Sequence, residues 1–118
     1  MTRALRWLPA LLIAGLLVYF SSRSPAELPG PSLAGGLDKV AHFVAYAALA
    51  LAVRLAWRPR TLWPVVVVVG LFGGSDELHQ GLTPGRDPSG WDLVADVGGA
   101  ATAMLVFGRM NRTAAAAV

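Results

Sequence analysis

The residues best suited to chemistry lie in one stretch, positions 76–96, with the sequence DELHQGLTPGRDPSGWDLVAD. This stretch holds five acidic residues, one His and one Arg, and apolar runs flank it on both sides. A charged side chain costs roughly 2.5–3.5 kcal/mol at the centre of a membrane helix on insertion scales. Such a concentration of charge beside apolar runs predicts a polar functional site at one face of a membrane.

Acid–base chemistry is one use for such a site. His42 has the properties of a general base, with Asp38 or Asp76 to orient its ring and Arg86 to stabilise developing negative charge. The candidate catalytic residues are His42, Asp76, Glu77 and Asp96. The sequence contains neither G-x-S-x-G nor H-E-x-x-H, so the reaction class stays open.

Binding of an anionic head group is the preferred alternative, because Lys39 and Arg86 stand among the carboxylates. The candidate binding residues are Lys39, Tyr46, Gln80, Arg86 and Asp92. A metal variant would use the four catalytic candidates, and their oxygen-rich set favours Mg, Ca or Mn over Zn. Our preferred interpretation assigns no metal ligand and identifies no cofactor. A proton path is the weakest hypothesis, because the other membrane face would hold no titratable relay.

Several of these residues also have simpler structural explanations. Asp38 is placed to cap a helix, and Asp92 can form a capping box with Ser89. Tyr46 can be an interfacial aromatic, Arg86 a lipid-headgroup contact, and Glu77 and His79 solvated side chains. His42 and Asp96 are harder to explain in this way, since each lies one turn inside an apolar run.

Helices must position these groups. We predict helices over 5–20, 38–57, 62–80 and 91–108, with Pro64 in a first turn and Arg109 and Arg112 ending the last helix. Asp38, His42 and Tyr46 recur every four residues and so share one helix face. Ala95, Gly99 and Ala103 form a small-residue stripe that allows close helix packing, which gives Gly99 a structural role.

The composition places the chain among membrane proteins. Of its 118 residues 55% are hydrophobic and 14% are charged, against about 25% charged in soluble domains. The chain has no cysteine, which excludes a disulfide framework and a thiolate metal site. The net charge of +3 is spread over the edges of apolar runs, so we expect no nucleic-acid binding.

The charges also predict an orientation. With four spans and the N-terminus inside, seven of the ten basic residues lie inside, and all seven acidic residues and both His lie outside. Both termini would then be cytoplasmic. The basic start and apolar run of residues 1–20 also suit a cleavable signal peptide, and cleavage would leave this orientation unchanged.

Two motifs resemble those of the VanZ-like family of small bacterial membrane proteins. They are Asp38-Lys39-x-x-His42-Phe43-x-x-Tyr46 and Asp76-Glu77-x-x-Gln80-(x5)-Arg86-(x5)-Asp92-(x6)-Gly99, within residues 38–106. The family usually has Asn where this chain has Asp96. Its founding member is associated with resistance to teicoplanin, a glycopeptide that acts on cell-wall precursors.

Taken with the resemblance, these features predict one all-α domain, residues 1–118, forming a four-helix bundle in the bacterial cytoplasmic membrane. We expect its polar site to face outward and to bind or act on an anionic envelope component. The expected partners are membrane lipid and a lipid-linked cell-wall precursor or similar anionic head group. The resemblance also suggests a link to glycopeptide resistance.

Overall fold

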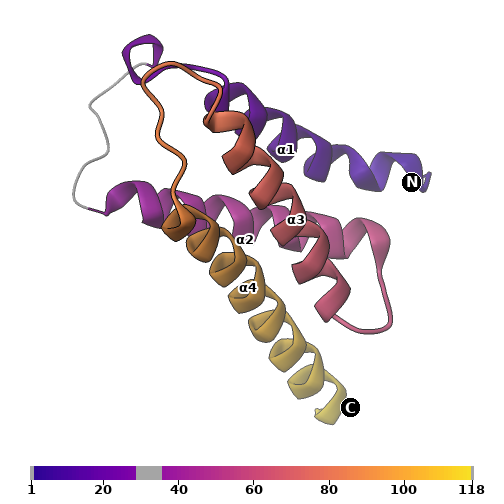
Figure 1. Ribbon diagram of the computed structural model, residues 1–118. Helices are drawn as coiled ribbons and strands as arrows, with labels where there is room; N and C mark the ends of the chain where they lie inside the picture. Colours follow the sequence, from indigo (N-terminus) through magenta and orange to yellow (C-terminus); the bar gives the residue numbers. More distant parts are fainter. Residues whose placement is uncertain (1, 29–35, 118) are drawn as a thin grey trace.

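The computed structural model describes residues 2–28 and 36–117, and all regular structure in these ranges is helical. A 3₁₀ turn, Ala4–Trp7, leads into α1, Leu8–Ser21, and a second 3₁₀ turn spans Pro25–Glu27. The other helices are α2, Leu37–Trp57; α3, Trp63–Gln80; and α4, Gly90–Ala116. Figure 1 shows that the helices come together near the start of α4 and that the two chain ends lie far apart. The all-α prediction is confirmed.

The predicted caps of α2 and α4 are wrong. α2 begins at Leu37 after Gly36, whose φ of +87° suits glycine, so Asp38 lies within the first turn. A carboxylate in the first turn still interacts favourably with the positive, N-terminal end of the helix dipole. Ser89 is the N-cap of α4 but makes no side-chain cap bond, so the capping box with Asp92 does not form.

The C-terminal end of α4 also differs from the prediction. The helix passes through Arg109 and Arg112 and ends at Ala116. Arg and Ala are strong helix formers, and an exposed charge does not itself end a helix. The expected position of Pro64 in the first turn of α3 is confirmed.

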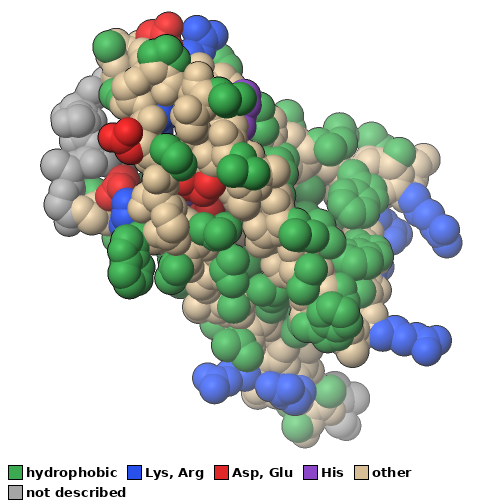
Figure 2. Space-filling view, viewed as in Figure 1, with side chains coloured by type: hydrophobic (Ala, Val, Ile, Leu, Met, Phe, Trp, Pro, Cys, Tyr) green, Lys and Arg blue, Asp and Glu red, His purple; other side chains and the backbone are tan. Residues whose placement is uncertain are grey.

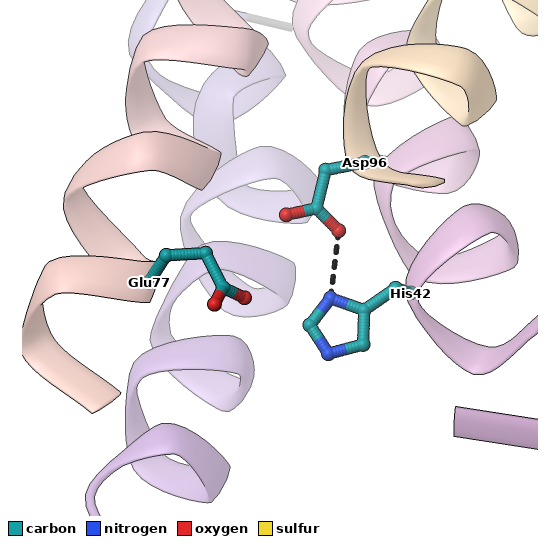
Figure 3. A group of neighbouring side chains, drawn as sticks. All are labelled: His42, Glu77 and Asp96. Carbon is teal, nitrogen blue, oxygen red and sulfur yellow. Dashed lines mark hydrogen bonds and ion pairs between the residues drawn. The ribbon is translucent and has the colours of Figure 1, made fainter. Parts of the chain in front are cut away.

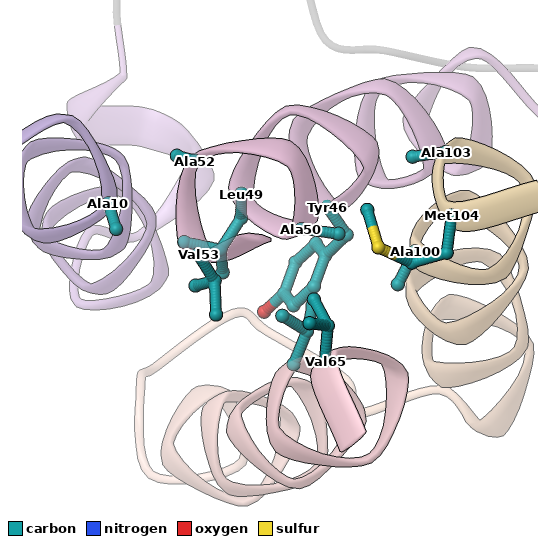
Figure 4. Packing of buried hydrophobic residues seen from close by; sticks show 11 residues of the cluster. Ala10, Tyr46, Leu49, Ala50, Ala52, Val53, Val65, Ala100, Ala103 and Met104 are labelled. Carbon is teal, nitrogen blue, oxygen red and sulfur yellow. The ribbon is translucent and has the colours of Figure 1, made fainter. Parts of the chain in front are cut away.

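The core lies where α2 packs against α3 and α4 (Figure 4). Ala50 and Ala100 are fully buried there, and Val65 and Val69 of α3 close the third side. At Gly99 an added Cβ would overlap the Phe43 carbonyl group of α2. The predicted small-residue stripe therefore lies in this interface, with Gly99 and Ala103 both buried.

The outer surface of the helices is strongly apolar, as expected for contact with lipid. Among the described residues, three helical segments are long and apolar enough to cross a membrane: Ala4–Ser21, Leu37–Trp57 and Gly90–Ala116. The last turns of α3 carry Asp76, Glu77 and Gln80, whose side chains are buried inside the bundle.

Charge is unevenly distributed over the molecule. In the face shown in Figure 2, acidic side chains gather where the helices come together, and most basic side chains lie near the opposite ends. Between α1 and α2, the backbone N–H of Ser24 donates a 2.8 Å hydrogen bond to Glu27 Oε2. Hydrogen bonds from Ser24 hold the pKa of the Glu27 carboxyl below its usual range.

Candidate functional site

The centre of the site is a hydrogen-bonded pair, His42 of α2 and Asp96 of α4. His42 Nδ1 lies 2.7 Å from Asp96 Oδ1, and Asp96 has no exposed surface. Asp92, one turn earlier on α4, has its Oδ2 3.9 Å from His42 Nε2. The four-residue spacing of Asp92 and Asp96 thus aims both carboxylates at one imidazole.

Glu77 of α3 completes a group of three, named here the His42–Glu77–Asp96 cluster (Figure 3). One ligand atom from each residue lies within 4.8 Å of the other two. Glu77 Oε2 accepts a 3.0 Å hydrogen bond from the Ser89 backbone N–H. Glu77 Oε1 and Asp96 Oδ2 are buried and have no hydrogen-bond partner among the described residues. The cluster therefore holds two carboxylate oxygens whose bonding capacity is unused.

Gly73 makes room for this cluster. A Cβ at Gly73 would lie 3.0 Å from Asp96 Oδ2 and 3.1 Å from the Tyr46 ring. Since real Cβ contacts are rarely so short, a larger residue would displace Asp96 or Tyr46.

Lys39 lies at the rim of the site. Its Nζ contacts both Asp38 Oδ2 and Asp92 Oδ1, and more than a third of its side chain is exposed. The Lys39 charge is therefore already balanced by two carboxylates. Its predicted place beside the acidic residues is confirmed.

Asp76 belongs to a separate hydrogen-bonded group. Its Oδ2 accepts hydrogen bonds from Ser21 Oγ at 2.7 Å, Tyr46 Oη at 3.3 Å and Gln80 Nε2 at 3.4 Å. The residue that bonds to His42 is Asp96, so the expectation that Asp38 or Asp76 orients this ring is wrong. The two groups are neighbours through Tyr46, whose ring lies parallel to that of His42 at 6.2 Å.

Arg86 takes a different position from the one predicted. Its Nε and Nη2 donate to the backbone carbonyl oxygens of Arg23 and Phe20, at 3.1 and 3.0 Å. Within the described ranges, it forms no ion pair with a carboxylate. Arg86 thus fastens the loop before α4 to the end of α1, and the prediction that it is a counter-charge in the cluster is wrong.

Sequence reasoning missed Ser21 and Gly73. Ser21 is buried, donates to Asp76 and receives a 3.3 Å hydrogen bond from Gln80 Nε2. A usable signal existed for Ser21: it is the first polar side chain after a long apolar run, at the depth predicted for the acidic residues. No one-sequence signal distinguishes Gly73 from Gly74, because only the packing of α3 decides which one faces Asp96.

A surface hollow of about 210 Å³ adjoins the cluster. It is lined by Gly74, Glu77 and Leu78 of α3, by Leu93 of α4 and by the turn 88–90. Glu77 thus borders both the hollow and the buried His42–Asp96 pair.

Comparison with known protein families identifies the family of this chain. Residues 4–111 match the family model described as VanZ/LLP1. The chain belongs to the VanZ/LLP1 family. The match covers all four α-helices almost completely, including α1, which lies outside the two motifs noted in the sequence. No curated protein and no solved structure matches the chain.

In this VanZ/LLP1 chain, residues from all four helices meet at the polar end of the bundle. The arrangement offers an imidazole held by a carboxylate, a second buried carboxylate at the edge of an apolar hollow, and a lysine at the rim. Side chains of these types can exchange a proton, hold a cation or contact the polar end of an amphiphile.

Proposed function

We propose that this chain is a multi-pass protein of the bacterial cytoplasmic membrane that engages the head group of an anionic envelope amphiphile. Lipid-linked cell-wall precursors are the class of ligand intended. The polar end of the bundle would face outward, in keeping with the excess of arginine at the other end. Family membership and three helices able to cross a membrane support the membrane setting.

The observation that carries the proposal is the position of Glu77. Its carboxylate lines the hollow between α3 and α4 and also belongs to the buried cluster. Leu78 and Leu93 supply apolar walls suited to a lipid chain, as is usual for pockets with few polar groups. An amphiphile in the hollow would place its polar end beside the cluster, with the cationic side chains of Lys39 and Arg86 at the same end of the bundle.

Substitution of glycines tests this proposal. Gly74 and Gly15 both have open space where a Cβ would be, but only Gly74 lines the hollow. In lipid nanodiscs, we expect Gly74→Leu to weaken binding of a polyprenyl phosphate at least about tenfold, which is 1.4 kcal/mol. Gly15→Leu should leave binding unchanged. Native mass spectrometry would measure the bound fraction.

Arg86 gives a second test of the same proposal. Arg86→Ala removes a cation at the polar end, whereas Arg58→Ala removes an exposed cation at the other end. Binding that is absent in the unchanged protein, or equal in both variants, would contradict head-group recognition at this end.

A membrane hydrolase or transferase is the second candidate, favoured by the 2.7 Å contact between His42 and Asp96. A carboxylate on Nδ1 fixes the tautomer and leaves Nε2 as the proton acceptor. We expect His42→Gln to lower turnover of an envelope lipid by about 10²–10⁴-fold, the usual contribution of a general base. His79→Gln, which changes an exposed ring, is the control. Lipid mass spectrometry would measure the substrate lipid in cells expressing each variant. The lipid should accumulate with His42→Gln and stay at the level of the unchanged protein with His79→Gln.

The association of the family's founding member with teicoplanin gives a cellular test. The chain expressed in a susceptible host should raise the inhibitory concentration of teicoplanin, and Glu77→Gln should reduce this gain. An unchanged concentration would remove the resistance link and leave the binding measurements unaffected.

A further inference from the structure

The buried carboxylates of this site exceed the cations that face them. Lys39 forms ion pairs with both Asp92 and Asp38. Within the described part of the chain, Glu77 and Asp96 face the His42 ring of α2, and each keeps one buried oxygen without a hydrogen-bond partner. An unsatisfied buried polar group costs about 1–3 kcal/mol, and more when it is charged. Apart from the His42 imidazole, no cationic side chain among the described residues faces Glu77 and Asp96.

The spacing of the cluster suits a metal ion. Its three ligand atoms lie within 4.8 Å of one another. Ligands at about 2.1 Å from Mg²⁺ or 2.4 Å from Ca²⁺ are separated by roughly 3–5 Å from each other. The side chains would need only small rotations to close around an ion.

The two buried carboxylate groups face the same space. Asp96 is fully buried and Glu77 is 7% exposed. Figure 3 shows both carboxylates directed toward the gap that they share with the His42 ring. Gly73 leaves this gap open beside Asp96 Oδ2.

We propose that His42, Glu77 and Asp96 bind one divalent cation of the Mg²⁺ and Mn²⁺ class. Two carboxylates and one imidazole form a mostly oxygen donor set, which favours these ions. Asp76 also has a partnerless oxygen, but it lies outside this three-residue group and is held by Ser21 and Gln80. The site goes beyond the function proposed above and does not depend on it.

A cation here would change the electrostatics of the hollow. Three protein ligands leave positions free on an ion that prefers about six. Glu77 borders the hollow, so these positions would be within reach of a phosphate or carboxylate entering it. The positive charge of the ion would then strengthen the attraction of an anionic group to this end of the bundle.

Electron paramagnetic resonance with Mn²⁺ tests the site directly. The protein, purified without a polyhistidine tag, should remove one equivalent of Mn²⁺ from the six-line signal of the free ion. Glu77→Gln should weaken binding about tenfold or more, since even outer-shell changes cost 10–100-fold. Asp87→Asn, which removes an exposed acid at the same end, should bind as the unchanged protein does.

A pulsed measurement identifies the ligand without relying on the stability of a ligand variant. Bound Mn²⁺ should show electron spin echo modulation from an imidazole nitrogen. The chain has two histidines, so the modulation should persist in His79→Gln. No saturable Mn²⁺ binding, no nitrogen modulation, or equal affinity in Glu77→Gln would each overturn the proposal. Polyprenyl phosphate binding can succeed or fail independently of these results.

Discussion

Asp76 illustrates how single side chains stabilise this bundle. Its carboxylate is buried, yet three uncharged donors from α1, α2 and α3 share one of its oxygens. Such hydrogen bonds offset the cost of taking a carboxylate out of water, and removing one leaves the carboxylate poorly compensated. Ser21 makes the shortest of the three bonds at 2.7 Å.

We therefore expect Ser21→Ala to lower the free energy of unfolding by about 0.5–2 kcal/mol, the range that covers hydrogen bonds in membrane and soluble proteins. Ser22→Ala is the matched control, because Ser22 is exposed and its hydroxyl bonds, among the residues the structure describes, only to the Val18 carbonyl and to exposed His79. Thermal unfolding in detergent would compare them. Equal midpoints for the two variants would contradict the structural role given to Ser21.

Among the described helices, α2 and α4 have the most extensive contact, and small residues allow them to pack closely. Gly99 lies directly against the Phe43 backbone, so the two helices meet without intervening side chains. Close backbone approach of this kind is the usual basis of membrane helix association. It also brings His42 and Asp96, which belong to these two helices, within 2.7 Å.

Two neighbouring glycines provide the test of this packing. A Cβ at Gly98 would meet only the Phe43 ring at 3.7–3.8 Å, an ordinary contact. Gly98→Ala should be neutral or stabilising by up to about 1 kcal/mol through helix propensity. Gly99→Ala should destabilise by several kcal/mol, as overpacking against backbone does. Chemical unfolding in mild detergent would measure both, and similar values would argue against the α2–α4 contact.

On the scale of the whole molecule, the acidic end and the arginine-rich end face opposite ways. The loops at residues 22–28 and 81–89 belong to the first, and the loop at residues 58–62 belongs to the second. If all four helices cross the membrane, these loops lie on opposite sides of it. The buried position of the polar residues of α3 makes such a crossing feasible, since the bundle shields them from lipid.

Because the chain has no cysteine, an introduced one is unique. We expect Asp87→Cys to react with a membrane-impermeant maleimide on intact spheroplasts, because Asp87 is exposed at the acidic end. Thr61→Cys, exposed in the other loop, should react only after lysis. The opposite pattern, or labelling of both from outside, would overturn the proposed orientation.

The sequence allowed prediction of the helices and of the end at which the polar residues meet. Apolar runs and the four-residue spacing of Asp38, His42 and Tyr46 were sufficient for this. The choice of Asp96 rather than Asp76 as the partner of His42 depends on how far each helix is rotated about its axis. That rotation is decided by contacts such as Gly99 with Phe43, which join distant parts of the chain. The hydrogen bonds from Arg86 to backbone carbonyls could not be predicted either, because they depend on the geometry of the loop before α4.

The hydrogen bond between Ser21 and Asp76 joins residues 55 positions apart. During translation the first helix leaves the ribosome well before its acceptor does. Asp76 can therefore gain this donor only after the third helix and its preceding loop have emerged. The hydrogen bonds around Asp76 are therefore completed only after synthesis has passed the end of α3 at Gln80.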